Sequence, residues 1–319
     1  MGIIDMHCDT IYSIYHGEEK SLSKNSYSID IEKLKKGNVL AQFFALYIDK
    51  GWIDEKHLDI YQHAKDLYRV FSSQMEDNKE NIRHATSHKD LQKNIQEGKI
   101  SAFLTIEEGD FLQGKLERLD EFYALGLGLI TLTWNYENCI GYPNSSDRNL
   151  MAKGLKPFGF EVVERMNQLG MIIDVSHLSD GGFYDCIQHS NKPIVASHSC
   201  ARSLVNVPRN MTDDMLKLLG EKGGMVGINF SPNFLGPDRD KVSRVKYMVE
   251  HIKYMKNIAG IDAIGLGTDF DGIGGELEIK DMGEIDKLII ALEQAHFHPD
   301  EIEKICTKNA ERIIKECIG

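Results

Sequence analysis

The sequence predicts an α/β protein folded as a closed (β/α)8 barrel of the TIM type. Eight short apolar runs alternate with helix-like segments, the order expected for βα units with right-handed crossovers. The length of 319 residues suits such a barrel, and no low-complexity linker divides the chain. Histidine, aspartate and glutamate follow several of the runs. We therefore expect one barrel domain over residues 1–319, with these side chains on its C-terminal rim.

The expected strands are nearly continuous apolar runs, which is typical of strands buried on both faces of a parallel sheet. An open sheet would instead favour a glycine-rich phosphate loop after a strand. Gly265 and Gly267 lie inside a strand, so this motif is absent. The eight runs cover residues 3–7, 39–47, 100–107, 126–133, 170–177, 193–198, 224–230 and 263–269.

The segments between the runs have helical periodicity. Leu58, Tyr61, Ala64 and Leu67 recur at three-residue steps, and residues 58–75, 158–169, 212–221 and 242–259 are expected helices. Residues 299–319 predict one or two short helices packed on the outside of the barrel. Residues 135–153 are polar and follow the fourth strand, so we expect an active-site loop there.

The composition excludes several classes of protein. A net charge of −12 disfavours broad nucleic-acid binding, which needs clustered basic residues. No apolar run approaches the roughly 20 residues of a membrane span, and the N-terminus lacks the pattern of a secretion signal. The six cysteines form no CxxC pair. We expect a cytoplasmic protein with reduced thiols and neither nucleic-acid nor membrane partners.

His7 and Asp9 form an HxD pair at the first strand end. Residues two apart on a strand face the same side, so both side chains could bind one cation. An ordinary buried His–Asp hydrogen bond is the alternative. Glu107 and Glu108 end the third run, where a buried acid must be paired or metal-bound. Two adjacent acids cannot both face inward, and solvation of one or both at a loop start is the alternative.

His177 and His198 each follow a serine at a strand end. One such histidine is usually structural, but two beside an HxD pair and a glutamate predict a metal site. Asp269 ends the last strand and could move the proton of a water bound there. Its rival, Asp271, reads as a turn residue ahead of Gly272.

Other hydrolytic nucleophiles fit poorly. The GxSxG elbow of many serine hydrolases is absent. Cys8 and Cys200 lie beside histidines, but neighbouring strand residues point to opposite faces. The residues therefore favour a metallohydrolase.

With these motifs in hand, the chain resembles the membrane (renal) dipeptidase family of the amidohydrolase superfamily. The resemblance extends from Asp5-Met6-His7-Cys8-Asp9 to Gly267-Thr268-Asp269-Phe270-Asp271-Gly272. It implies a (β/α)8 barrel that binds two zinc ions and hydrolyses dipeptides through a metal-bridging hydroxide. It suggests a soluble bacterial-type member and a possible homodimer.

The resemblance also implies roles for individual residues. The family pattern Glu-Gly-Gly-His aligns with Glu107-Glu108-Gly109-Asp110, which favours Glu107 over Glu108 as the ligand. Asp269 would contact the bridging water and transfer its proton, and Arg209 would hold the substrate carboxylate. The first metal would be bound by His7, Asp9 and Glu107, and the second by Glu107, His177 and His198.

Two positions depart from the family pattern. Trp134 stands where mammalian members have a substrate-contacting histidine, and Asp110 replaces another histidine. Tryptophan donates one hydrogen bond but does not titrate like imidazole. Trp134 and Asn135 are therefore expected substrate contacts. Three alternatives remain at this point: another binuclear amidohydrolase acting on N-acyl amino acids or a lactone, a phosphoesterase-type hydrolase with one metal, and a non-catalytic binding protein.

Overall fold

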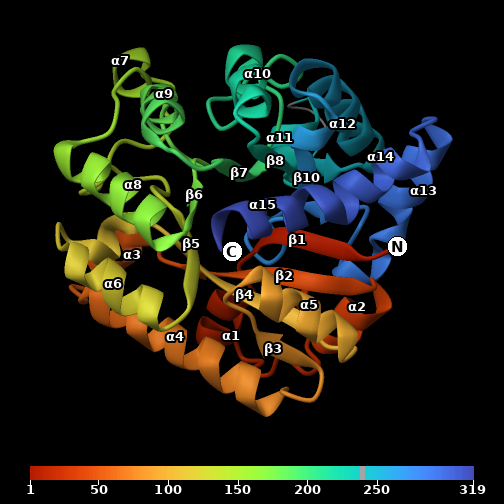
Figure 1. Cartoon of the computed structure of the whole chain (residues 1–319), viewed down its shortest axis with the longest axis horizontal. Coiled ribbons are helices and arrows are strands. Elements are labelled where there is room, and N and C mark those ends of the chain that lie inside the picture. The colour runs from red at the N-terminus through yellow and green to blue at the C-terminus, as the bar shows by residue number, and fades with distance from the viewer. Residues whose placement is uncertain (238–240) are drawn as a thin grey trace.

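The computed structural model describes residues 1–237 and 241–319 and shows a closed ring of parallel strands surrounded by helices (Figure 1). Neighbours along the ring pair in parallel, and pairing between the last strand and the first closes it. The predicted barrel is therefore confirmed. The ring contains β1 (Ile3–Cys8), β2 (Val39–Tyr47), β4 (Ile100–Glu107), β5 (Leu127–Thr131), β6 (Ile172–Asp174), β7 (Val195–Ser199), β8 (Met225–Ile228) and β10 (Ile264–Leu266).

Three short strands were not predicted. β3 (Ile82–His84) pairs with the first residues of β4, before β5 begins to pair with that strand. β9 (Val242–Ser243) and β11 (Glu276–Leu277) form a small separate sheet. Strands of two or three residues are too short to show a periodicity in the sequence.

Four ring strands end earlier than predicted, β5 and β8 by two residues each and β6 and β10 by three residues each. The runs 170–177 and 263–269 were expected as strands, but β6 ends at Asp174 and β10 at Leu266. Side chains bind the next backbone amides. Asp174 accepts from the Ser176 N–H at 2.9 Å, and Asp5 accepts from the Thr268 N–H at 2.8 Å. The residues that follow β6 and β10, including His177 and Asp269, therefore lie in irregular backbone.

The four predicted helices are present with small shifts at their ends, as α4 (Ile60–Asp77), α8 (Pro157–Leu169), α10 (Asp213–Glu221) and α12 (Val245–Ala259). Polar side chains cap several helices, as Thr212 does for α10. The other helices are α1 (Thr10–His16), α2 (Ile31–Lys36), α3 (Lys50–Glu55), α5 (His88–Gln96), α6 (Leu116–Ala124), α7 (Arg148–Met151), α9 (Asp180–His189), α11 (Pro232–Leu235), α13 (Asp286–Gln294), α14 (Pro299–Glu303) and α15 (Asn309–Cys317). Short helical turns are η1 (Gly109–Leu112), η2 (Ile261–Ala263), η3 (Met282–Glu284) and the π-turn η4 (Lys304–Lys308).

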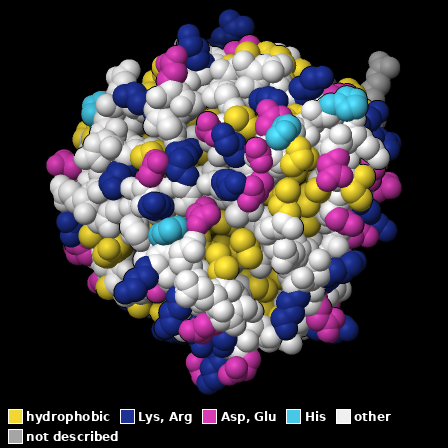
Figure 2. Space-filling view, turned by 45° about the vertical axis from the view of Figure 1, so that its right-hand side comes forward, with side chains coloured by type: hydrophobic (Ala, Val, Ile, Leu, Met, Phe, Trp, Pro, Cys, Tyr) yellow, Lys and Arg dark blue, Asp and Glu magenta, His cyan; other side chains and the backbone are white. Residues whose placement is uncertain are grey.

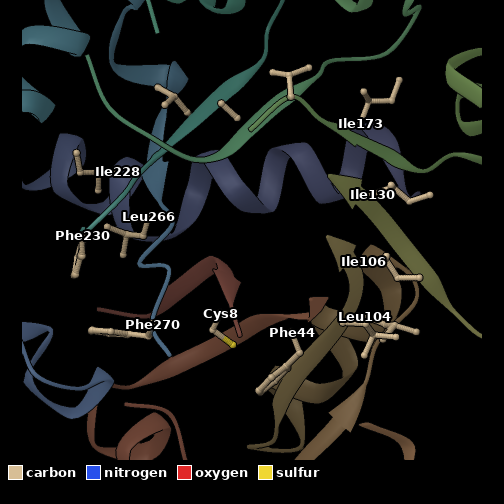
Figure 3. Close-up of a cluster of buried hydrophobic side chains, with 14 of the residues drawn as sticks. Cys8, Phe44, Leu104, Ile106, Ile130, Ile173, Ile228, Phe230, Leu266 and Phe270 are labelled. Carbon is tan, nitrogen blue, oxygen red and sulfur yellow. The ribbon is translucent and has the colours of Figure 1, made fainter. Parts of the chain in front are cut away.

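The main apolar layer lies between the ring and the helices. Its members come from strands around the ring, and Figure 3 shows Cys8, Phe44, Ile106, Ile173 and Leu266 among them. These five side chains are almost completely buried. Burial of this layer is the main stabilising contribution to the barrel because the free energy gained scales with apolar area removed from water.

The tail of the chain lies elsewhere than predicted. α15 crosses the end of the ring in Figure 1 and does not join the outer helices. Its apolar side chains, including Ile313 and Ile314, pack against a second cluster that contains Ile4, Phe43 and Phe103 from the strands. The expected position on the outside of the barrel was wrong for α15, whereas α14 of the same segment packs against the outer helix α13. These strand side chains need an apolar cover, and the three- and four-residue spacing in α15 provides one.

The exposed surface is mixed in charge. In Figure 2 lysine and arginine side chains are interspersed with aspartate and glutamate, with apolar side chains between them. Within the described residues, no helix is both long enough and apolar enough to cross a bilayer.

Candidate metal centre

A cavity of about 400 Å³ lies beyond the C-terminal ends of the ring strands. Acidic and imidazole side chains form its floor, and aromatic side chains form much of its wall. The lining includes Asp9, Glu107, His177, Asp269, Tyr12, Tyr47, Trp134, Asn135 and Phe234. The predicted convergence of polar strand ends on one rim is thus found in the structure.

Glu107 occupies the centre of this group. It is 2% exposed at the end of β4. Its Oε2 lies 3.5 Å from His7 Nε2, and its Oε1 lies 3.1 Å from His177 Nε2 and 3.4 Å from His198 Nε2. The two carboxylate oxygens therefore face two different sets of imidazole nitrogens.

His7 and Asp9 converge on the first of these sets. The register of β1 against β2 shifts between Asp5 and Cys8, so the backbone is irregular where these side chains leave it. Asp9 precedes α1 but does not cap it, and its Oδ1 lies 3.5 Å from His7 Nε2. That separation is too long for a good hydrogen bond. The arrangement differs from the ordinary His–Asp hydrogen bond considered as the alternative.

The second set contains two oriented histidines. Ser197 Oγ donates to Asp174, so it accepts from His198 Nδ1 at 2.7 Å, which leaves His198 Nε2 free to accept. His177 Nδ1 lies 3.1 Å from the acceptor Asn135 Oδ1, so Nδ1 carries the proton and the unprotonated Nε2, 3.1 Å from Glu107 Oε1, can bind a metal. The φ angle of His177 is 66°, a conformation uncommon for a non-glycine residue.

Of the two candidates Asp269 and Asp271, Asp269 lies in the cluster. Its Oδ1 lies 3.9 Å from His7 Nε2, and its Oδ2 accepts from Asn229 Nδ2 at 2.8 Å. Burial raises the pKa of Asp269 to about 7, with His7 opposing the increase and Asp9 adding to it.

Asp271 has a structural role. Its carboxylate accepts from Thr10 Oγ1 and from the Ser28 N–H, both at 2.6 Å. It therefore ties the loop after β10 to the N-terminal region. A Cβ atom at the next residue, Gly272, would lie 1.9 Å from Asp9 Oδ2, so glycine is needed for this loop to approach the cluster.

Glu107 and Glu108 are both buried, which contradicts the alternative that one or both adjacent acids are solvated. As expected, the two acids do not face the same way. Glu108 accepts from the N–H groups of Asp110 at 2.9 Å and Trp134 at 3.1 Å, and from Asn138 Nδ2. Burial raises the pKa of Glu108 to about 7. These backbone and side-chain donors satisfy the carboxylate in place of water.

The donor set fits a divalent metal. Four buried donor or acceptor atoms have no hydrogen-bond partner in the part of the chain that the structure describes: His7 Nδ1 and Nε2, Asp9 Oδ1 and Glu107 Oε1. Donor atoms lie within 4.8 Å of one another in two groups, His7 with Glu107 and His198, and His7 with Asp9 and Asp269. Imidazole nitrogen and carboxylate oxygen suit zinc. Burial alone would lower the pKa of His7. The negative charges of Asp9 and Glu107 outweigh this effect, so the pKa of His7 lies well above its ordinary value. A cation would neutralise this excess of buried negative charge.

The three expected substrate residues lie at or beside the cavity. Trp134 and Asn135 line it. Arg209 is 8% exposed, its Nη2 donates to the His198 carbonyl at 2.8 Å, and its Nε has no hydrogen-bond partner among the described residues. Its guanidinium lies 5.5 Å from the centre of the Phe234 ring, which lines the cavity.

Sequence reasoning missed the residues that orient the cluster. Asp174 accepts a hydrogen bond from Ser197, and Asn229 donates one to Asp269. The cavity is also lined by Tyr12 and Tyr47. Asp174 and Asn229 are polar residues inside apolar strand runs. That interruption was a signal available in the sequence, whereas nothing local marked the two tyrosines.

The comparisons with known proteins identify a family. The profile of a family described as membrane dipeptidase (peptidase family M19) matches residues 1–318. An uncharacterized protein in the pqqA 5′ region of Klebsiella pneumoniae is 35% identical over 243 residues, 73% of this chain and 88% of that protein. The dipeptidase tcpJ of Claviceps purpurea (strain 20.1) is 28% identical over 294 residues, 90% of this chain and 69% of that protein.

Solved structures support the fold. A structure described as the metallopeptidase dipeptidase AC of family M19 has a TM-score of 0.91 at 22% identity, covering 100% of this chain and 99% of that one. A metallopeptidase from Rhodobacter sphaeroides, solved with a phosphinate mimic of the dipeptide L-Ala-D-Ala, has a TM-score of 0.89 at 21% identity, with 99% of each chain covered.

The support of His198 by Asp174 is testable. The Asp174 carboxylate accepts from Ser176 and Ser197. Asp174→Asn replaces one acceptor oxygen with an NH₂ donor that faces these donors, so we expect the free energy of unfolding to fall by about 1–3 kcal/mol. We also expect zinc affinity to fall about ten-fold, because the orientation of His198 is lost. Urea unfolding and competitive zinc titration measure the two effects. Asp120→Asn, at an exposed ion pair with Arg165, is the control. Equal zinc affinity in both variants would contradict the orienting role.

Proposed function

Because the chain belongs to the membrane dipeptidase family, peptidase family M19, we propose that it is a zinc-dependent dipeptidase acting at the cluster around Glu107. The family assignment makes the chain a peptide-bond hydrolase of the metallodipeptidase type. The proposal adds the metal, its ligands and the chemistry. The observation that carries it is that the two oxygens of one buried carboxylate face separate sets of nitrogens.

Two zinc ions are the proposed cofactor. His7, Asp9 and Glu107 would hold the first, and Glu107, His177 and His198 the second, with Glu107 shared. Zinc bound there would polarise the peptide carbonyl and provide hydroxide near neutral pH. The alternative with a single metal is less well supported, because donor atoms gather on both sides of Glu107.

Asp269 is the proposed proton carrier. Its Oδ2 is held by Asn229, whereas its Oδ1 is turned toward His7 and the cluster. Oδ1 would take the proton of the attacking water and return it to the amine nitrogen that leaves.

Arg209 is the proposed carboxylate anchor. A buried guanidinium without an anionic partner is costly, and a substrate carboxylate would provide that partner. Its Nε is free of hydrogen bonds among the described residues, and Nη2 is fixed on the His198 carbonyl. The substrate carboxylate would then lie near His177 and His198, beside the peptide bond that is cleaved.

The size of the cavity favours a small substrate. About 400 Å³ accommodates a dipeptide and little more. Trp134 and Asn135 line this space and are proposed to contact the substrate. An N-acyl amino acid offers the same amide and carboxylate, so it is the closest alternative substrate. A lactone lacks the carboxylate that Arg209 would bind.

Metal removal tests the function directly. Protein dialysed against a chelator should lose hydrolysis of dipeptides of both chiralities, and zinc should restore it to most of the starting rate. Zinc content per chain should approach zero after dialysis and two after zinc is added back. N-acyl amino acids and lactones are assayed in parallel. Faster hydrolysis of either class than of every dipeptide would replace the proposed substrate.

Asp269→Asn tests the proton carrier. The amide keeps the shape of the side chain but cannot accept a proton, so kcat should fall about 10²–10⁴-fold. Zinc content should stay equal to that of the parent protein, which separates lost proton transfer from lost metal. A variant with full zinc and unchanged kcat would exclude this role.

Arg209→Gln tests the carboxylate anchor. The parent should prefer dipeptides over the corresponding dipeptide amides, and this preference should fall at least about ten-fold in the variant, because a buried charge pair is lost. Comparing kcat/KM for each acid and its amide cancels general losses of activity. An unchanged ratio would show that Arg209 does not bind the carboxylate.

A further inference from the structure

The loop after β4 and the loop after β5 are joined by two acids outside the metal cluster. Glu108 and Asp110 both follow Glu107, and both bind residues 134–139. This segment begins with the two cavity residues Trp134 and Asn135. The proposed reaction assigns no role to the two acids.

Glu108 holds the start and the end of the segment at once. Its Oε2 accepts from the Trp134 N–H at 3.1 Å, and its Oε1 accepts from Asn138 Nδ2. The Asn138 amide also donates to the Leu132 carbonyl at 2.9 Å, and its oxygen accepts from two following N–H groups. Glu108 is 0% exposed, so bulk solvent does not compete for these bonds.

Asp110 supplies a second attachment. Its Oδ1 accepts from the Cys139 N–H at 3.0 Å, and its Oδ2 forms an ion pair with Lys50 from α3. The three loops that follow β2, β4 and β5 are therefore connected through one carboxylate.

The backbone at Glu108 shows that a side chain is retained at a position that disfavours one. Its φ and ψ angles are 97° and 102°, in a region that glycine adopts readily and other residues adopt rarely. Such conformations persist where surrounding interactions hold them and are concentrated at functional sites. Here the interactions are the bonds from Asp110, Trp134 and Asn138.

The segment that Glu108 holds touches the cluster in two ways. The Trp134 ring packs edge-on against Tyr47 at 4.9 Å between centres, and both rings line the cavity. Asn135 Oδ1 lies 3.1 Å from His177 Nδ1. Asn135 is itself exposed, and its backbone directly follows that of Trp134, whose N–H Glu108 holds.

We propose that Glu108 is a positioning residue that holds Trp134 against the cavity and Asn135 against His177. This inference rests on the proposed function, since it concerns the same cavity and the same histidine. Glu108 acts through the Trp134 backbone and through Asn138, and it touches neither substrate nor metal. A purely structural role would stabilise the barrel without affecting the order of Trp134 or the affinity of the site.

Tryptophan fluorescence tests the proposal without any assay of activity. The chain has two tryptophans, so Trp52→Phe leaves Trp134 as the only reporter. In this background Glu108→Gly removes the carboxylate and suits the positive φ angle, so the barrel should fold. Glu108→Gln keeps the volume but replaces one acceptor oxygen with a donor. Glu137→Gln is the matched control, because Glu137 lies in the same segment but is exposed and paired with Lys156 at 2.7 Å.

Acrylamide quenching of Trp134 should increase in Glu108→Gly, increase less in Glu108→Gln and stay at the parent level in Glu137→Gln. Zinc affinity should fall about ten-fold in Glu108→Gly, as is typical when support for a metal-binding histidine is lost. With dipeptides, KM should rise while kcat changes less. Unchanged quenching and zinc affinity in a folded Glu108→Gly protein would overturn the proposal. Absence of dipeptidase activity in the parent would reject the proposed function, and quenching would still decide the role of Glu108.

Discussion

The buried carboxylate of Glu107 is the constraint on which the rest of the site depends. A carboxylate at 2% exposure is strongly unfavourable unless partners surround it. Its two oxygens face His7 on one side and His177 with His198 on the other. These histidines come from β1, from the loop after β6 and from β7, so closure of the ring is what brings them to one carboxylate. The cluster therefore forms only when the barrel is closed.

A second layer of polar groups keeps the cluster in place. Asp174 orients His198 through Ser197, and Asn229 holds Asp269. His177 and Asp269 both have positive φ angles, which fits strained backbone at a functional site. Hydrogen bonds to buried acids end β6 and β10 early and allow this backbone to form. At the rim, regular strand pairing therefore stops early, and the irregular backbone that follows directs His177 and Asp269 toward the cluster.

The two ends of the barrel have opposite character. α15 covers the apolar end, where its side chains meet the inner residues of the strands. The polar cluster and a cavity of about 400 Å³ lie at the other end. The proposed dipeptide would therefore meet a rigid floor of metal-binding side chains, while loops after β4 and β5 shape the walls. Glu108 lies behind one of those walls and holds it through Trp134 and Asn138, which links its burial to substrate and metal binding.

The sequence by itself determined the eight strands of the ring and the set of residues at their ends, because apolar runs and strand-end acids or imidazoles are local signals. A family resemblance, and not periodicity, favoured Glu107 over Glu108. Only the tertiary structure decided the early ends of β6 and β10, the position of α15 and the burial of Glu108. Each depends on partners far away in the chain: Asp5 for Thr268, the inner strand residues for α15, and Trp134 with Asn138 for Glu108. Local patterns cannot report such contacts, because they exist only once the ring has closed.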